Sequence, residues 1–353
     1  MMSEPPAIHA RSDEGARLLR RTSERRAVAG ADLRLPRDLR LNERDRLAAR
    51  TLIEQMVRAV DDQLRAAIAD RFAAHPAVHA ALASAQVDLA APILLGSAAL
   101  ADADLIGLVL RRGEEHRFYL AARGANDRLQ TLVGEPDGEI AAGAMSVLTA
   151  RSRRLDRFGE PVLARTELPA DLQHRLVWTV AAALRSYLVD RQEIEPAFAD
   201  RVLGDAASSL LAGYDEADSL EARSTMLTHA LQAAGRLDGS TLVDFLAQGT
   251  LSLFLAALSA RTGIAYSAVW DILGDPDLRG PAMLLRAAGL DRQQAAQVVL
   301  LLSPKASDDV LIEQIETFDM LGIEEAGDQL RLWLIDPSYR DAVRRLSGVG
   351  SEA

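Results

Sequence analysis

A short helical phrase recurs along the first half of the chain and constrains the fold more than any other feature. Each occurrence combines an acidic residue near its start, small residues with aliphatics three and four positions apart, and a polar turn. The step between occurrences is about 21 to 27 residues, which is short for a two-helix repeat. One such unit cannot bury its apolar face alone, so neighbouring units must stack. The occurrences lie at 62–68, 88–94, 115–120, 138–144 and 160–165.

The composition favours helix-on-helix packing. Hydrophobic residues make up 49% of the 353 residues, but aromatic residues only 4%, and alanine and leucine dominate. Small side chains let helices approach closely, and the residues that favour strands are scarce. We therefore predict an all-α fold, namely a HEAT-like α-solenoid of short helix pairs followed by an aperiodic helical domain.

Three segments follow from the pattern. Residues 1–40 are rich in arginine and are predicted to form an N-terminal arm, residues 41–191 the HEAT-like repeat domain, and residues 192–353 a C-terminal helical domain. The polar break at 192–196 marks the predicted boundary. Beyond it, Ser240 is the predicted N-cap of a helix. Glycines are predicted at helix ends, where the left-handed conformation favours them: Gly235, Gly249, Gly263, Gly274, Gly289 and Gly322.

Several runs resemble one bacterial family. The runs are 160–172, 87–94 followed by 100–105, and 256–263 followed by 285–290. In this order they resemble the domain of unknown function 2336 family, which is found mainly in alphaproteobacteria, and the likeness covers roughly residues 45 to 300. The resemblance implies a HEAT-like, all-helical fold. It brings no catalytic motif and no agreed activity.

The residue inventory excludes several kinds of chemistry. The chain has no cysteine, which excludes disulfides and thiolate sites. Its net charge of -11 argues against broad binding to nucleic acid or to anionic membranes. Lys305 is the single lysine among 40 basic residues, which leaves little scope for lysine chemistry. No signal peptide or membrane-spanning stretch is visible, so we expect a cytoplasmic protein.

One arginine cluster is the candidate ligand site. Arg151, Arg153, Arg154 and Arg157 lie close together, and Asp156 completes a loose Arg-x-x-Asp pattern. Arginine suits phosphate because its planar guanidinium can donate two parallel hydrogen bonds. The cluster therefore allows a phosphate or nucleotide site, such as one for a cyclic dinucleotide. The alternative is a solvated helix end whose arginines pair with nearby acids.

Two other patterns are better explained by helix starts. His75 and His79 have the spacing of a metal pair, but Pro76 between them favours a helix that begins there. Asp102 and Asp104 could serve acid–base catalysis, yet they suit an N-cap and a first helical turn. We expect no catalytic residue, no metal ligand and no cofactor.

These observations favour a non-enzymatic scaffold or regulatory module that binds a protein partner. A nucleotide or second-messenger sensor using the arginine cluster is the first alternative. A helical-repeat enzyme acting on nucleic acid is the second, and the net charge argues against it. The C-terminal domain is expected to cap the repeats or to form a homodimer.

Overall fold

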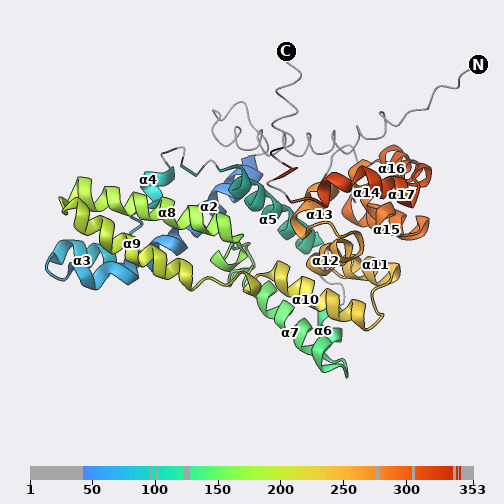
Figure 1. The fold of residues 1–353 in the computed structure, drawn as a ribbon, viewed down its shortest axis with the longest axis horizontal. Coiled ribbons are helices and arrows are strands. Elements are labelled where there is room, and N and C mark those ends of the chain that lie inside the picture. The colour runs from blue at the N-terminus through green and yellow to red at the C-terminus, as the bar shows by residue number, and fades with distance from the viewer. Residues whose placement is uncertain are drawn as a thin grey trace, which may run out of the picture. The chain divides into compact units, whose positions relative to one another are not determined.

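The computed structural model consists of helices joined by loops (Figure 1). Its described residues contain no β-strand, and one isolated antiparallel bridge joins Leu155 to Pro161. The predicted all-α class is confirmed. The predicted arm at 1–40 lies outside the described part of the chain. The structure describes residues 43–95, 97, 99–100, 102–121, 128–274, 279–303, 307–336, 339–340 and 342.

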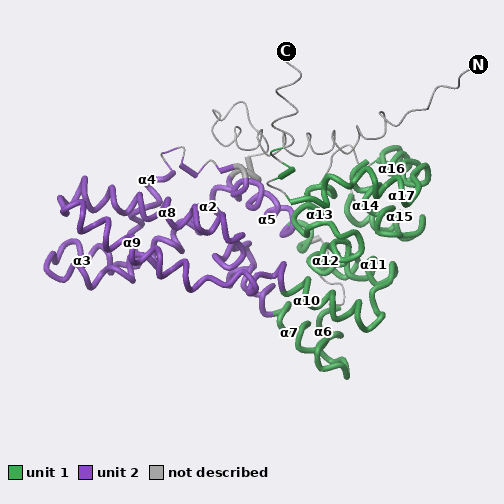
Figure 2. The backbone as a smooth tube through the Cα atoms, viewed as in Figure 1, with its two compact units in different colours: residues 1–25, 117–148, 223–353 green, residues 26–116, 149–222 purple. Residues whose placement is uncertain are grey.

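The helices divide into two compact units, which Figure 2 colours separately. Unit 2 lies within 26–116 and 149–222, and unit 1 takes up the remaining described residues. Both units are therefore discontinuous in sequence. The division falls within helices α5 (Ala103–Ala121), α7 (Gly138–Ser152) and α10 (Leu220–Ala233).

Unit 2 is built around one long helix. Helix α2 (Glu43–Ile68) packs against α8 (Ala170–Ser186) and α9 (Pro196–Ala212). Its buried residues recur three and four positions apart, and five of the apolar ones have no exposed surface: Met56, Val57, Val60, Leu64 and Ile68. Fully burying one such side chain stabilises the folded state by about 1.5–3 kcal/mol relative to leaving it exposed. The unit also contains α3 (Pro76–Ala83), α4 (Ala91–Leu95), the first part of α5, the last turn of α7 and the first residues of α10.

The polar break predicted as a domain boundary is a tight turn between α8 and α9. Helix α8 ends in a π-helical turn, Tyr187–Arg191, and Glu193 then adopts a positive φ of 53°. Glu195 caps α9 by accepting from the amides of Ala197 and Phe198, at 2.9 and 2.6 Å. Both helices belong to unit 2 and pack on one another. The boundary of a domain at residue 192 stays a prediction.

Unit 1 is organised around a helix that is apolar on every side. All residues of α12 (Leu251–Thr262) from Leu251 to Leu258 are buried. A helix of this kind must be enclosed by others. Three helices pack against it, namely α11 (Gly239–Ala247), α13 (Tyr266–Leu273) and α14 (Arg279–Ala287). The other helices are α6 (Arg128–Val133), α7 (Gly138–Ser152), α10 (Leu220–Ala233), α11 (Gly239–Ala247), α13 (Tyr266–Leu273), α14 (Arg279–Ala287), α15 (Arg292–Leu302), α16 (Asp308–Met320) and α17 (Ile323–Gln329).

The recurring phrase does not adopt one recurring structure. At 62–68 it forms the end of α2, at 115–120 it lies inside α5, and at 138–144 it begins α7. The occurrence at 88–94 leads into the short helix α4, whereas 160–165 is mostly extended loop. Tertiary packing overrides local propensity here. The 26-residue α2 also exceeds the short helices that the phrase predicts.

The predicted helix ends are partly right. Gly235, Gly249, Gly263 and Gly289 have φ between 68° and 75°, the left-handed conformation predicted for them. Gly274 has a φ of -80°, and Gly322, with a φ of -74°, precedes α17 as its N-cap. The predicted cap Ser240 is wrong: Asp238 caps α11, because its carboxylate accepts from the Thr241 amide at 2.8 Å. Ser240 lies within the first turn of that helix and donates to Asp238.

No described helix alone has the length and hydropathy to cross a membrane. One pair passes the same test jointly, α12 and α13, which are bent at 105° to each other.

Candidate functional site

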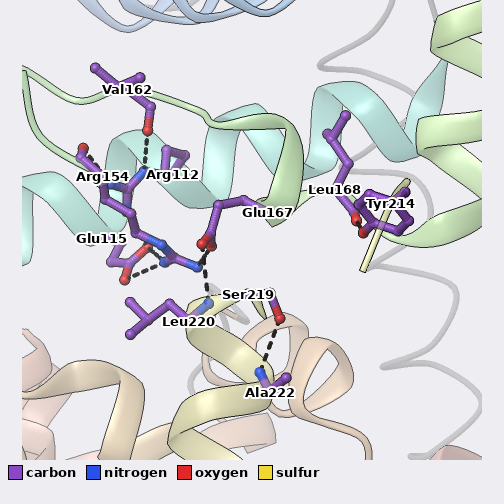
Figure 3. Close-up of polar contacts among 10 residues, drawn as sticks. All are labelled: Arg112, Glu115, Arg154, Val162, Glu167, Leu168, Tyr214, Ser219, Leu220 and Ala222. Carbon is purple, nitrogen blue, oxygen red and sulfur yellow. Dashed lines mark hydrogen bonds and ion pairs between the residues drawn. The ribbon is translucent and has the colours of Figure 1, made fainter. Parts of the chain in front are cut away.

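The segment between α7 and the 3-10 turn η3 (Arg165–Glu167) forms a closed loop in unit 2, named here the 153–162 loop. Val162 N donates to Arg154 O at 2.9 Å and joins the two sides of the loop. A buried arginine of α5 reinforces this closure. Arg112 Nη2 donates to Arg154 O at 2.7 Å, and its Nε donates to Val162 O at 3.2 Å (Figure 3). One guanidinium therefore fixes both ends of the loop.

The tip of this loop is a tight turn fixed by its own residues. Asp156 N donates to Glu160 O at 2.9 Å. The Asp156 carboxylate accepts from the amides of Phe158 and Glu160, at 2.7 and 2.9 Å. Gly159 has a φ of 81°, a conformation that glycine adopts without steric cost. The sequence Asp-Arg-Phe-Gly thus encodes the turn locally.

Buried charges hold the base of the loop. Glu115 of α5 accepts from Arg112 Nη1 at 2.7 Å and from Arg154 Nη1 at 2.6–2.8 Å. Burial would raise the pKa of Glu115, but the charges of Arg154 and Arg112 outweigh it and lower that pKa. The Glu115 side chain is therefore an anion committed to two arginines.

Glu167 completes this cluster and extends it to the next helix. Its side chain is 2% exposed and accepts from Arg154 Nη2 and, at 3.1 Å, from Leu220 N (Figure 3). It therefore satisfies an amide at the start of α10, where the helix dipole favours an anion. Two arginines and two glutamates balance one another, which makes their burial tolerable. We call Arg112, Glu115, Arg154 and Glu167 the charge cluster.

The exposed part of the loop is an aromatic ring paired with a cation. Phe158 is 75% exposed, and the guanidinium carbon of Arg157 lies 4.6 Å from its ring centroid. A single exposed apolar side chain is ordinary on a protein surface. This one differs because a defined turn and a buried charge cluster hold its backbone.

The predicted arginine cluster is divided between two roles. Arg154 points into the charge cluster, and the Asp156 carboxylate is bound to backbone amides of its own turn. Arg151 lies half-buried in the last turn of α7. Arg153 and Arg157 are exposed. Whether these residues bind a phosphate stays a prediction.

The other sequence candidates lie at helix starts, as predicted. Asp102 accepts from the amides of Asp104 and Leu105 at 2.9 and 3.1 Å and caps α5. Arg175 binds both aspartates from α8, at 2.9 and 3.1 Å. His75 is the N-cap of α3, and Pro76 is its first residue. The described residues include no group of three or more histidine, aspartate or glutamate side chains placed to hold a metal.

Sequence reasoning missed most of this site. Arg112 and Arg154 are separated by 42 residues, and Glu167 and Leu220 by 53, so no local pattern joins them. Phe158 could have been found from the Asp-x-x-Gly spacing of Asp156 and Gly159, which is typical of a tight turn.

Comparison with known proteins gives one finding. A family model described as an uncharacterised protein conserved in bacteria, domain of unknown function 2336, matches residues 89–331. This range contains the 153–162 loop and the whole charge cluster. No curated protein and no solved structure matches the chain.

Proposed function

The chain belongs to the bacterial family of domain of unknown function 2336, and we propose, from its anchored loop, that it is a non-enzymatic scaffold or regulatory protein. It acts by binding a protein partner in the cytoplasm, with the 153–162 loop as a contact point. The carboxylates of the charge cluster support this reading because both are engaged by arginines. They are therefore poor acid–base groups.

The observation that carries the proposal is the rigidity built into the loop. Binding normally costs the free energy of ordering a loop, and a loop that is already fixed in the free protein avoids that cost. The backbone under Phe158 is already fixed by Asp156, and the base is fixed by Arg112. Aromatic and arginine side chains are enriched among the residues that dominate binding energy. Arg157 and Phe158 supply one of each.

The proposed architecture is HEAT-like stacking. Its support is that helices consecutive in sequence pack on one another, as they do in such repeats. The packed pairs include α8 with α9, α11 with α12, α12 with α13, α13 with α14, and α15 with α16. A homodimer through residues 192–353 remains part of the proposal. Sedimentation at increasing protein concentration tests for it.

Site-specific crosslinking tests the protein-binding function. A photoreactive phenylalanine analogue at position 158 of the full chain, in cells of the native host, is expected to capture a protein. The matched control places the same analogue at Trp178, an exposed aromatic position on α8 of the same unit. If position 158 captures nothing beyond what position 178 captures, the proposed function is wrong.

The second-messenger reading predicts a different result. Calorimetry with cyclic dinucleotides would give heat that disappears in Arg153→Ala. On the proposed function we expect no heat, because Arg154 is occupied by Glu115 and Glu167. A third reading, an enzyme acting on nucleic acid, needs a continuous basic face. The net charge of -11 argues against it.

A further inference from the structure

We infer that the solvent-facing side of helix α16 in unit 1 binds the arginine-rich segment at residues 17–26 of the same chain. This contact concerns a different surface from the 153–162 loop and does not depend on the proposed function.

Helix α16 carries large apolar side chains on the side that faces solvent. It packs against α14 and α15 (Figure 1), and Gln314 and Phe318 are its buried residues. On the opposite side, Ile312 is 55% exposed and Met320, about two turns later, is 77% exposed. Large apolar side chains gathered on one exposed helix face, with a polar rim, are typical of a surface that binds a partner.

Carboxylates border these two apolar side chains. Asp309 and Glu316 lie three and four positions from Ile312, and Glu313 and Glu316 lie seven and four positions from Met320, so they share one side of the helix. All three carboxylates are exposed. We call Asp309, Ile312, Glu313, Glu316 and Met320 the outer face of α16.

The negative charge extends beyond the outer face. From Ser307 to Gln329 the chain has eight acidic residues and no basic one. The helices packed against α16 do not reverse this sign: the range 279–334, which includes α14 and α15, has nine acidic and five basic residues, a net charge of -4. Of its arginines, Arg286 donates to Leu321 O and Arg292 is paired with Asp319. The outer face therefore suits a partner that is both apolar and positive.

The segment at 17–26 has this combination of residues. It contains five arginines and one glutamate, a net charge of +4, and Leu18 and Leu19 stand between Arg17 and Arg20. The leucines match the apolar side chains of the outer face, and the arginine fork pairs well with carboxylates. The segment lies outside the described part of the chain, which begins at Glu43.

The segment is also tethered to the protein. Residues 27–42 join it to α2, and sixteen residues extend to about 50–58 Å, more than the width of about 40 Å of a compact unit of this size. A tethered segment has an effective concentration of about millimolar. A contact made by a few ion pairs and two leucines therefore forms within the chain.

Other occupants fit these observations less well. A second copy that presented the same face would place carboxylates against carboxylates. Anionic lipids would be repelled in the same way. A basic segment of another protein would match the charge but would lack the tether.

Thiol crosslinking of the purified full chain tests the contact. The chain has no cysteine, so Ser23→Cys and Met320→Cys supply the only two thiols for a short bismaleimide. The matched control pairs Ser23→Cys with Met226→Cys, since Met226 is a methionine of unit 1 that is 58% exposed on α10. We expect an intrachain crosslink at position 320 in about tenfold higher yield than at position 226, as the effective concentration of a docked segment requires.

Charge reversal tests the chemistry of the contact. We expect Arg20→Glu with Arg21→Glu, or Glu313→Arg with Glu316→Arg, to lower the yield at position 320 about tenfold, because like charges then face each other. Combining the two pairs should restore the yield to within about threefold, since the interaction belongs to the pair of surfaces. Misfolding cannot produce this restoration.

Three results would overturn the inference. The first is a yield at position 320 no higher than at position 226, which would mean that something else covers the outer face. The second is a crosslink that joins two chains and rises with protein concentration, which would assign the segment to a second copy. The third is a yield that ignores both charge reversals. Each of these leaves protein binding through the 153–162 loop untouched.

Discussion

Single carboxylates at helix starts are the residues whose effects are most directly predictable. Asp238 accepts from the Thr241 amide, the Ser240 hydroxyl and the Thr241 hydroxyl, all within 2.8 Å. The Thr241 amide is the first cause that lowers the pKa of Asp238, to about 2. We expect Asp238→Ala to lower the free energy of unfolding by about 1 kcal/mol, the usual worth of an N-cap.

The pH dependence of this cap has a definite sign. Because the folded-state pKa of Asp238 is depressed, its full contribution to the free energy of unfolding is present above the ordinary aspartate pKa near 4. It is lost as the pH falls from about 4 toward about 2. The free energies of unfolding of the wild type and of Asp238→Ala, measured in urea, should therefore become equal as the pH falls through this range. Ser240→Ala is the control, and a larger loss there than in Asp238→Ala would contradict the assignment of the cap.

For single residues, sequence reasoning succeeds where the hydrogen bond joins near neighbours in the chain. Asp102 was predictable as a cap because its partners are two and three residues away. The same rule misplaced the cap of α11, since Asp238 and Ser240 are both good capping residues. The structure distinguishes them by the extended backbone at Asp238, with φ of -97° and ψ of 178°, and by the Thr241 amide that donates to its carboxylate. The charge cluster was out of reach because its members come from distant segments.

At the scale of elements, the charge cluster makes α5 the support of the 153–162 loop. Glu115→Gln would leave Arg112 and Arg154 buried without their shared anion. Removing one partner of a buried ion pair costs about 3–5 kcal/mol. We therefore expect Glu115→Gln to lower the free energy of unfolding in urea by an amount near the lower end of this range. Glu114→Gln, one position along on the exposed side of α5, is the matched control. We expect it to cost less than about 1 kcal/mol.

The same element has a predictable response to acid. The Glu115 pKa is lowered by Arg154 and Arg112 against the effect of burial. Its stabilisation is therefore present above the ordinary glutamate pKa near 4.3 and is lost as the pH falls through the lower folded-state value. The protection factors of amides in the 153–162 loop, which correct for the pH dependence of intrinsic hydrogen exchange, should fall below about pH 4 in the wild type. Glu115→Gln should show the faster exchange already at neutral pH, and equal exchange in both at neutral pH would contradict the role of this cluster.

The all-α class of the chain was predictable from its sequence, but the grouping of its helices was not. Composition and periodicity report which residues form helices and which face is apolar. They do not report that α2 packs against α8 and α9, more than 100 residues away, or that both units are discontinuous. The polar stretch at 192–196 shows why the grouping of helices could not be predicted. A turn within a unit and a linker between domains use the same residue types.

Arginines that cap other helices are a feature of both units. Arg65 donates to Ser84 O at the end of α3, Arg165 to Leu210 O in α9, and Arg261 to Ala288 O after α14. The last carbonyls of a helix lack partners within it, and the negative end of its dipole favours a cation. Some of the many arginines in this chain therefore bind carbonyl groups at helix ends, a role that the sequence alone did not reveal.

Substituting Arg286 tests whether arginines that bind carbonyls at helix ends stabilise the fold. It donates to Leu321 O after α16 at 2.7 Å, and its guanidinium carbon lies 5.1 Å from the ring centroid of Phe318, which is 1% exposed. Lysine keeps the charge but lacks the planar fork that donates and stacks together. We therefore expect Arg286→Lys to lower the free energy of unfolding by about 1–2 kcal/mol, near the worth of a hydrogen bond to a charged group. Arg50→Lys, at a side chain that is 65% exposed, should stay within about 0.5 kcal/mol. If both substitutions have the same small effect in thermal and urea unfolding, the arginines serve only as surface charge, and their capping role is wrong.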